Sequence, residues 1–122
     1  MSWQFVADRP IYSQLVEHLS IFIINGQYAA GSRLPSVRDL AAEAKVNPNT
    51  MQRALAELEN SGLVYSERTS GRFVTEDTEM IQSVKQKLAQ QRIEQFFADM
   101  KNLGLEWQQV LKMATEGKER KQ

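Results

Sequence analysis

Residues 36–58 read SVRDLAAEAKVNPNTMQRALAEL, and this stretch decides the fold. It divides at Asn47, a residue type that favours helix caps, and at Pro48, which suits the first position of a helix because no N–H donor is needed there. Apolar residues recur at helical spacing on both sides of this point, over residues 37–44 and again over residues 51–58. The stretch therefore predicts two short amphipathic helices joined by a tight connection, which is a helix-turn-helix.

A further helix is predicted before this motif. Pro10 is followed by apolar residues at spacings of three and four, and Gly26 is a plausible end of the helix. Two glycines and a proline then mark residues 27–35 as a loop.

A β-hairpin is predicted directly after the motif. Residues 63–67 and 72–75 are short runs with β-branched and aromatic side chains, separated by a loop that ends in Gly71. A hairpin in this position is the wing of a winged helix-turn-helix. We therefore predict a winged helix-turn-helix DNA-binding domain over residues 9–77.

The residues from Thr78 onward predict two more helices. A long polar helix ends near Gly104, and a final helix begins near Trp107. We assign residues 78–117 to a helical dimerisation domain and expect residues 118–122 to form a disordered tail. The predicted fold class is mainly α with a small β-hairpin: an N-terminal winged helix-turn-helix and a C-terminal two-helix dimerisation tail.

The C-terminal helices carry more apolar surface than so small a unit can bury. A segment of about 44 residues is close to the size below which a chain needs outside support to stay folded. We therefore expect an isologous homodimer, and the alternative is a tail that folds back onto its own winged domain. The predicted dimer-interface residues are Ile81, Val84, Leu88, Ile93, Phe96, Phe97, Met100 and Trp107.

Composition excludes several classes of function. The chain has 122 residues, of which 42% are hydrophobic, and it has no cysteine and a single histidine. Disulfides, thiolate zinc sites and cysteine nucleophiles are therefore excluded, and the histidine has no second one with which to bind a metal. No nucleophile and base pair, phosphate-binding glycine loop, membrane span or signal peptide is recognisable. We expect a cytoplasmic protein that is no enzyme and binds no metal, cofactor or membrane.

The overall charge does not indicate a nucleic-acid-binding protein, but the local charge does. Fifteen basic residues balance 15 acidic ones, so a strongly basic domain is absent. Six of the basic residues nevertheless fall within residues 33–72. Asn49, Gln52 and Arg53 project opposite the apolar stripe of the second helix of the motif, near the end that a recognition helix inserts into the major groove. The alternative is an ordinary solvated helix face.

These positions support a specific set of predicted DNA contacts. Asn and Gln side chains can pair with adenine, and an arginine can pair with guanine or bind a phosphate. Helix N-termini can present N–H groups to phosphates, and the wing tip suits a minor groove. The predicted DNA-binding residues are Arg33, Ser36, Arg38, Asn47, Asn49, Thr50, Gln52, Arg53, Ser70, Gly71 and Arg72. We expect Arg33, Arg38 and Arg72 to bind phosphates and Asn49 and Gln52 to carry the sequence preference.

Four ordered motifs resemble the GntR family of bacterial regulators. They are PIYSQL at residues 10–15, GSRLPSVRDLA at 31–41, VNPNTMQRA at 46–54 and LENSGL at 58–63. The short helical tail is similar to that of the YtrA branch, which lacks a large ligand-binding domain. The resemblance implies a homodimer that binds an inverted-repeat operator, usually as a repressor and often of neighbouring transporter genes.

The resemblance also carries residue roles. The DNA-contacting arginine of the family matches Arg38, the start of its recognition helix matches residues 47–53, and its wing glycine matches Gly71. Pro48 stands where many members have Arg or Ser, so base contacts known at that position do not transfer.

Together these patterns predict a sequence-specific DNA-binding transcriptional regulator, a repressor that binds double-stranded operator DNA as a homodimer. The alternative is a winged-helix protein-interaction module that does not bind DNA. The polar and basic outer face described above favours DNA binding. No feature of the sequence assigns a small-molecule effector.

Overall fold

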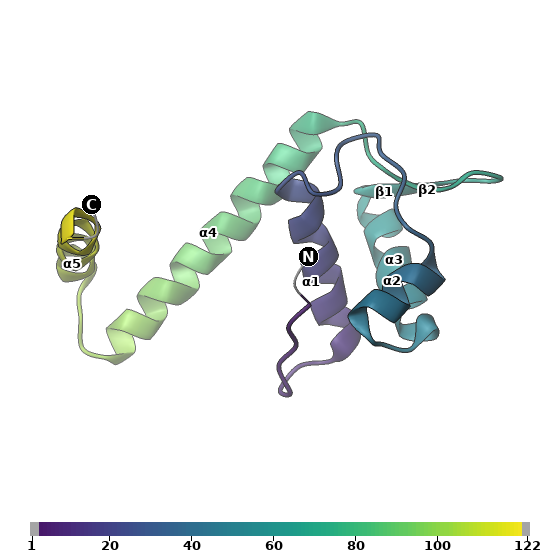
Figure 1. Ribbon diagram of the computed structural model, residues 1–122. Helices are drawn as coiled ribbons and strands as arrows, with labels where there is room; N and C mark the ends of the chain where they lie inside the picture. The colour runs from purple at the N-terminus through teal and green to yellow at the C-terminus, as the bar shows by residue number, and fades with distance from the viewer. Residues whose placement is uncertain (1–2, 121–122) are drawn as a thin grey trace. The chain divides into compact units, whose positions relative to one another are not determined.

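A computed structural model describes residues 3–120, with side chains described up to residue 117. In these residues the elements follow one another as α1 (Ile11–Ile24), α2 (Val37–Ala44), α3 (Pro48–Ser61), β1 (Val64–Glu67), β2 (Gly71–Val74), α4 (Thr78–Asn102) and α5 (Trp107–Arg120) (Figure 1). The chain divides into two compact units, one that ends at Lys85 and one that begins at Gln86. We call them the winged unit and the second unit.

Local signals explain α2 and α3. The Ser36 hydroxyl accepts a hydrogen bond from the Asp39 N–H (3.1 Å) and so caps α2. The Asn47 side chain accepts one from the Asn49 N–H (2.7 Å) at the start of α3. Between the two helices, Lys45 adopts a left-handed conformation with φ of 59°, which reverses the chain within a short turn. The predicted helix-turn-helix is therefore confirmed.

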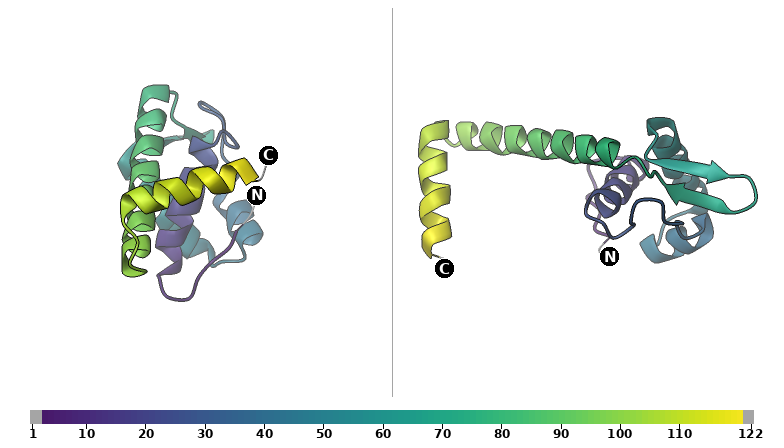
Figure 2. Two further views of the ribbon diagram at one scale, coloured as in Figure 1. Left: turned by 90° about the vertical axis from the view of Figure 1, so that its left-hand side faces the viewer. Right: turned by 90° about the horizontal axis from the view of Figure 1, so that it is seen from above.

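The core of the winged unit lies where α1, α2 and α3 meet, under the base of the hairpin. Figure 2 shows the three helices around a common centre, with the hairpin projecting from them. The side chains that are most completely buried come from every one of these elements: Leu15, Leu19, Leu40, Met51, Leu55, Leu58, Val64 and Val74. These apolar positions of the helices are the stripes that the sequence periodicity predicts.

The wing contains a third strand-like segment, within the residues 27–35 that the sequence predicts as a loop. β1 and β2 pair antiparallel, with Val64 opposite Val74. On the other side of β2, the Leu34 N–H donates to the Arg72 carbonyl (2.8 Å) and the Val74 N–H donates to the Ser32 carbonyl (2.9 Å). Two features hide this pairing in the sequence. The glycines and the proline of residues 27–35 indicate a loop, and β2, with which residues 32–34 pair, lies almost 40 residues further along the chain. The pairing attaches the wing to the residues that lead into α2.

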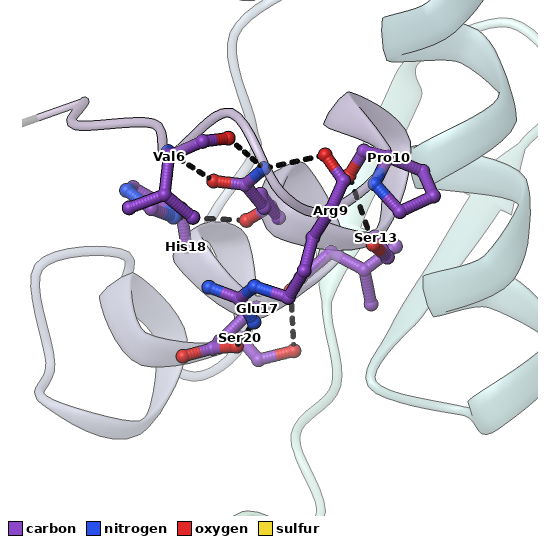
Figure 3. A network of polar contacts seen from close by, with 9 residues as sticks. Val6, Arg9, Pro10, Ser13, Glu17, His18 and Ser20 are labelled. Atoms are coloured by element: carbon purple, nitrogen blue, oxygen red, sulfur yellow. Dashed lines mark hydrogen bonds and ion pairs between the residues drawn. The ribbon is translucent and has the colours of Figure 1, made fainter.

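The segment before α1 is joined to that helix by polar contacts, most of them to the buried Gln14 side chain. The Gln14 side chain is 1% exposed, accepts from the Val6 N–H (2.8 Å), and donates to the carbonyls of Val6 (2.8 Å) and Arg9 (2.9 Å) (Figure 3). His18 accepts from the Gln4 N–H through Nε2 (3.2 Å), so Nδ1 carries the proton and donates to the Gln14 carbonyl (2.8 Å). The winged unit therefore includes residues before residue 9, where the sequence analysis began the domain.

The first turns of α4 belong to the winged unit. Ile81 and Val84, together with Met80, pack against its hydrophobic core. The sequence places Ile81 and Val84 at a predicted dimer interface, and in the structure both are half-buried against the core of their own chain. The helical period alone could not distinguish a partner in the same chain from one in another copy.

The second unit consists of the rest of α4 and of α5. Gly104 is in a left-handed conformation (φ of 86°), and the Leu105 N–H donates to the Met100 carbonyl (3.1 Å), which ends α4 as the sequence predicts. α5 continues to Arg120, past residue 118, where the sequence analysis began a disordered tail. Residues 121 and 122 of that tail lie outside the described residues.

Several large apolar side chains of the second unit are exposed to solvent. Leu103 is 71% exposed and Trp107 is 57% exposed. Ile93, Phe96, Leu111 and Met113 are exposed to a similar extent, whereas Val110 is buried. Among the residues that the structure describes, no helix combines the length and apolar character that a membrane span requires.

Candidate nucleic-acid interface

The outer face of α3 carries the polar residues that the sequence analysis selected. Met51, Ala54 and Leu55 are buried against the core, whereas Asn49 and Gln52 are exposed on the opposite side of the helix. Both amide side chains therefore face solvent near the N-terminal end of α3. This placement leaves their donors and acceptors available to base edges.

Arg53 shares this part of α3, but its side chain does not extend freely into solvent. Its guanidinium carbon lies 3.6 Å from the centre of the Tyr12 ring, so the guanidinium stacks on an aromatic side chain of α1. The sequence analysis did not identify Tyr12 as part of the site. No local signal marks it, because the contact joins residues from two helices that are far apart in the sequence.

A hollow of about 380 Å³ lies between the start of α2 and the wing. It brings together five of the predicted DNA-binding residues from two segments of the chain, residues 33–38 and 71–72: Arg33, Ser36, Arg38, Gly71 and Arg72. Arg38 is exposed in the first turn of α2, and Arg33 is exposed on the segment that pairs with β2. Two arginines beside a helix N-terminus form a local positive site despite the zero net charge of the chain.

Gly71 is favoured by its backbone conformation, and Arg33 packs closely against it. Its φ of 105° is a conformation that side chains rarely adopt. A Cβ atom at this position would lie 3.1 Å from the Arg33 Nε atom, tighter than ordinary contact. A glycine here therefore lets Arg33 lie directly against the backbone of the wing.

Arg72 lies in the same hollow but is already paired within the protein. Its Nε donates to Glu59 Oε1 at 2.6 Å, and its side chain is only 20% exposed. The Ser66 hydroxyl donates to the same carboxylate oxygen. The hydrogen bond from Ser66 lowers the pKa of Glu59 most, and Arg72 lowers it further, against the opposing effect of burial. This ion pair competes with the predicted phosphate contact, so Arg72 is not among the contacts we propose below.

The other predicted residues are held by local structure. Ser36 and Asn47 use their side chains as helix caps, and each cap accepts one backbone N–H, from Asp39 and from Asn49. A helix N-terminus has up to four N–H groups without a partner in the helix, so the others can donate to an external acceptor. Thr50 is half-buried, and Ser70 is exposed at the tip of the wing. The tip also exposes Arg68, which the sequence analysis counted among the basic residues but did not place in the site. The signal that could have identified Arg68 is its position as a basic residue within the hairpin loop.

Comparison with known protein families identifies the family of this chain. The family described as "Bacterial regulatory proteins, gntR family" matches residues 11–74, from the start of α1 to the end of the wing. The chain belongs to the GntR family. The resemblance inferred from the four motifs is confirmed, as is the winged fold.

Relatives of known sequence extend this similarity over almost the whole GntR chain. The HTH-type transcriptional regulator YhcF of Bacillus subtilis is 38% identical over 96% of this chain and 99% of the relative. The HTH-type transcriptional repressor YtrA of the same organism is 30% identical over 85% of this chain and 81% of the relative. These relatives are named as regulators of transcription and not as enzymes.

Solved structures show the same architecture. A GntR family transcriptional regulator from Listeria monocytogenes covers 92% of this chain and 98% of its own, with 38% identity and a TM-score of 0.85. The DNA-binding domain of AraR, crystallised in complex with operator ORX1, covers 59% of this chain and 93% of its own, with 27% identity and a TM-score of 0.55. The winged unit therefore shares its fold with a domain that binds operator DNA.

Proposed function

We propose that this GntR protein is a sequence-specific DNA-binding transcriptional regulator that binds an inverted-repeat operator as a homodimer and acts as a repressor. The observation that carries the proposal is the exposed amide pair, Asn49 and Gln52, on the outer face of α3. The same winged unit has a hollow lined by Arg33 and Arg38. Amide groups read base edges, and arginines bind the phosphates that fix the position of the protein on the duplex.

The residues take different roles in this proposal. Asn49 and Gln52 contact base edges in the major groove, and Arg33 and Arg38 bind phosphates beside α2. Backbone N–H groups in the first turn of α2, capped by Ser36, add phosphate contacts. The first turn of α3, which is capped by Asn47 and contains Thr50, does the same. Ser70, Gly71 and Arg68 at the wing tip contact the minor groove or its phosphates.

The second unit supplies the dimer contact. Ile93, Phe96 and Trp107 are each about half exposed, which is unfavourable for large apolar side chains unless another surface covers them. Phe96 and Phe97 are in edge contact (ring centres 5.8 Å apart). Leu88, Phe97 and Met100 are half-buried. A second copy of the same unit covers this surface by two-fold symmetry.

The relatives support the direction of regulation. YtrA and NagR of Bacillus subtilis are both named as repressors. A dimer that occupies a promoter blocks the polymerase from the same DNA, so occupancy alone is sufficient for repression. A dimer also places two recognition helices about one helical turn apart, in successive major grooves.

Binding to selected DNA tests the proposal. Duplexes enriched from a random pool by the purified protein are compared with scrambled duplexes at two salt concentrations. We expect Arg38→Ala to weaken binding to both kinds of duplex alike, and to lower the slope of log affinity against log salt by about 0.9 for each lost phosphate contact. Lys87→Ala, which removes an exposed charge from α4, is the matched control and should leave both unchanged.

Gln52→Ala tests the reading of bases. It should reduce the preference for the selected sequence by about tenfold or more, because a good amide contact to adenine contributes roughly 1–3 kcal/mol of discrimination. Equal losses on selected and scrambled DNA would remove Gln52 from the base contacts. Failure of the wild-type protein to enrich any sequence would favour the protein-interaction alternative.

A further inference from the structure

The contact between Tyr12 and Arg53 holds a cation between α1 and α3, apart from the arginines beside α2 and the wing. A hollow of about 370 Å³ lies between the starts of α1 and α3 and is lined by Pro10, Ile11, Tyr12, Asn49, Thr50 and Arg53. It shares no residue with the hollow that contains Arg33 and Arg38. The first hollow is formed by α1 with α3, and the other by α2 with the wing. The winged unit therefore has basic hollows in two separate places.

Stacking on Tyr12 prepares Arg53 to bind an anion. A guanidinium that lies flat on an aromatic ring keeps its N–H groups in the plane of the stack, where they remain free to donate. Stacking also restricts a long side chain, so less conformational entropy is lost when a ligand binds. Among the side chains that the structure describes, no carboxylate lies within ion-pair distance of Arg53. Arg72, by contrast, is neutralised by Glu59.

We propose that Tyr12 and Arg53 form a second phosphate-binding site of the winged unit, in which the tyrosine ring positions the guanidinium for a phosphodiester group of DNA. This inference rests on the proposed function. The major groove is bordered by the phosphates of both strands, so a helix that enters it meets phosphates on both sides. Arg33 and Arg38 bind phosphates on the side of α2 and the wing, and Arg53 binds one on the side of α1.

In this proposal, two neighbouring residues of α3 have different roles, one in reading bases and the other in binding a phosphate. Gln52, which is not held by α1, reads bases, whereas Arg53 is turned toward α1 and contributes affinity without sequence preference. Tyr12 is a positioning residue, because its ring acts through Arg53. Its half-buried ring also packs against the winged unit, so the test must separate positioning from folding.

The experiment compares Arg53→Gln, Tyr12→Leu and Tyr12→Phe in the full chain, on a duplex selected by the wild-type protein and on a scrambled duplex. We expect Arg53→Gln to weaken binding to both duplexes by about tenfold or more, since hydrogen bonds to charged groups are the stronger kind. The slope of log affinity against log salt should fall by about 0.9 per protomer. Tyr12→Leu should lose most of the same affinity, whereas Tyr12→Phe retains the ring and should stay within about twofold of wild type.

The double variant and the melting temperature decide between positioning and folding. Tyr12→Leu combined with Arg53→Gln should bind no more weakly than Arg53→Gln alone, because the ring acts only through the arginine. Additive losses of affinity in the double variant would assign Tyr12 a purely structural role and overturn the proposal. So would a loss of affinity in Tyr12→Leu that is accompanied by a lower melting temperature but by no change in the slope of log affinity against log salt.

The remaining outcomes are also decisive. A loss by Arg53→Gln that is confined to the selected duplex would make Arg53 a base contact and overturn the phosphate site. Wild-type binding that Arg53→Gln leaves unchanged would overturn this inference alone. No binding of DNA by the wild-type protein would overturn the proposed function and this inference together.

Discussion

The winged unit and the second unit differ in the exposure of their large apolar side chains. Leu15, Leu19 and Leu55 of the winged unit are at most 1% exposed, whereas Leu103 and Trp107 of the second unit are 71% and 57% exposed. The winged unit therefore obtains its stability from contacts within one chain. The second unit leaves large apolar side chains exposed, which supports the proposal that a second copy covers them.

The largest expected effect is the loss of a side chain from the core of the winged unit. Leu55→Ala removes a side chain that is 1% exposed and leaves a cavity, so we expect the free energy of unfolding to fall by about 2–5 kcal/mol. Urea denaturation measures this. Leu103→Ala, in the second unit, is the matched control, and it should cost less than about 0.5 kcal/mol at protein concentrations too low for two copies to associate. Similar losses for the two variants would contradict the contrast between the units.

The next effect concerns the association of the second unit. Phe96→Ala should weaken self-association by about 2 kcal/mol, because large aromatic side chains at the centre of an interface contribute most of the binding energy. Analytical ultracentrifugation measures the dissociation constant, and near-ultraviolet circular dichroism reports whether the winged unit stays folded. An unchanged dissociation constant would show that this surface does not join two copies.

A smaller effect is expected at the N-terminal cap of α2. Ser36→Ala removes the acceptor for the Asp39 N–H, and we expect the free energy of unfolding to fall by about 1 kcal/mol. In the second unit, Gln109 accepts from the Glu106 N–H at 3.0 Å, and this contact is as exposed as that of Ser36. Over the described part of the chain, the core of buried residues includes residues of α2 but none of α5. Gln109→Ala should therefore change the stability of the winged unit less than Ser36→Ala does, and the reverse order in thermal denaturation would contradict this ranking.

The smallest effect is a pH dependence that arises from Glu59 in the winged unit. The pKa of Glu59 is lowered in the folded protein from an ordinary value of 4.5, first by the hydrogen bond from Ser66 and then by Arg72. A lowered pKa stabilises the folded state above pH 4.5, and this contribution is lost as the pH falls through the folded-state pKa. The stability advantage of wild type over Glu59→Gln should therefore shrink as the pH falls below 4.5. Parallel curves for the two proteins would contradict this.

The parts of the fold that sequence analysis predicted correctly depend on local signals. The caps at Ser36 and Asn47, the proline at position 48 and the helical spacing of apolar residues identified α2 and α3. The outer face of α3 followed from the same spacing, because it lies opposite the buried stripe. Each of these signals is contained within a few consecutive residues.

The features that sequence analysis missed depend on contacts between distant residues. The pairing of residues 32–34 with β2, the stacking of Arg53 on Tyr12 and the ion pair of Arg72 with Glu59 all join separate elements. Ile81 and Val84 follow an apolar period that does not say which surface they meet. The charge of an arginine can be read from the sequence, but whether a carboxylate already neutralises it cannot.

The most direct test of the central claim is the dependence of binding on the spacing of two half-sites. On an inverted repeat selected by the wild-type protein, inserting about five base pairs at the centre turns one half-site by roughly half a helical turn. We expect a large loss of affinity for the wild-type protein and little change for Phe96→Ala, which binds each half-site separately. Wild-type binding that does not depend on the spacing would contradict a regulator in which the second unit joins two winged units on one operator.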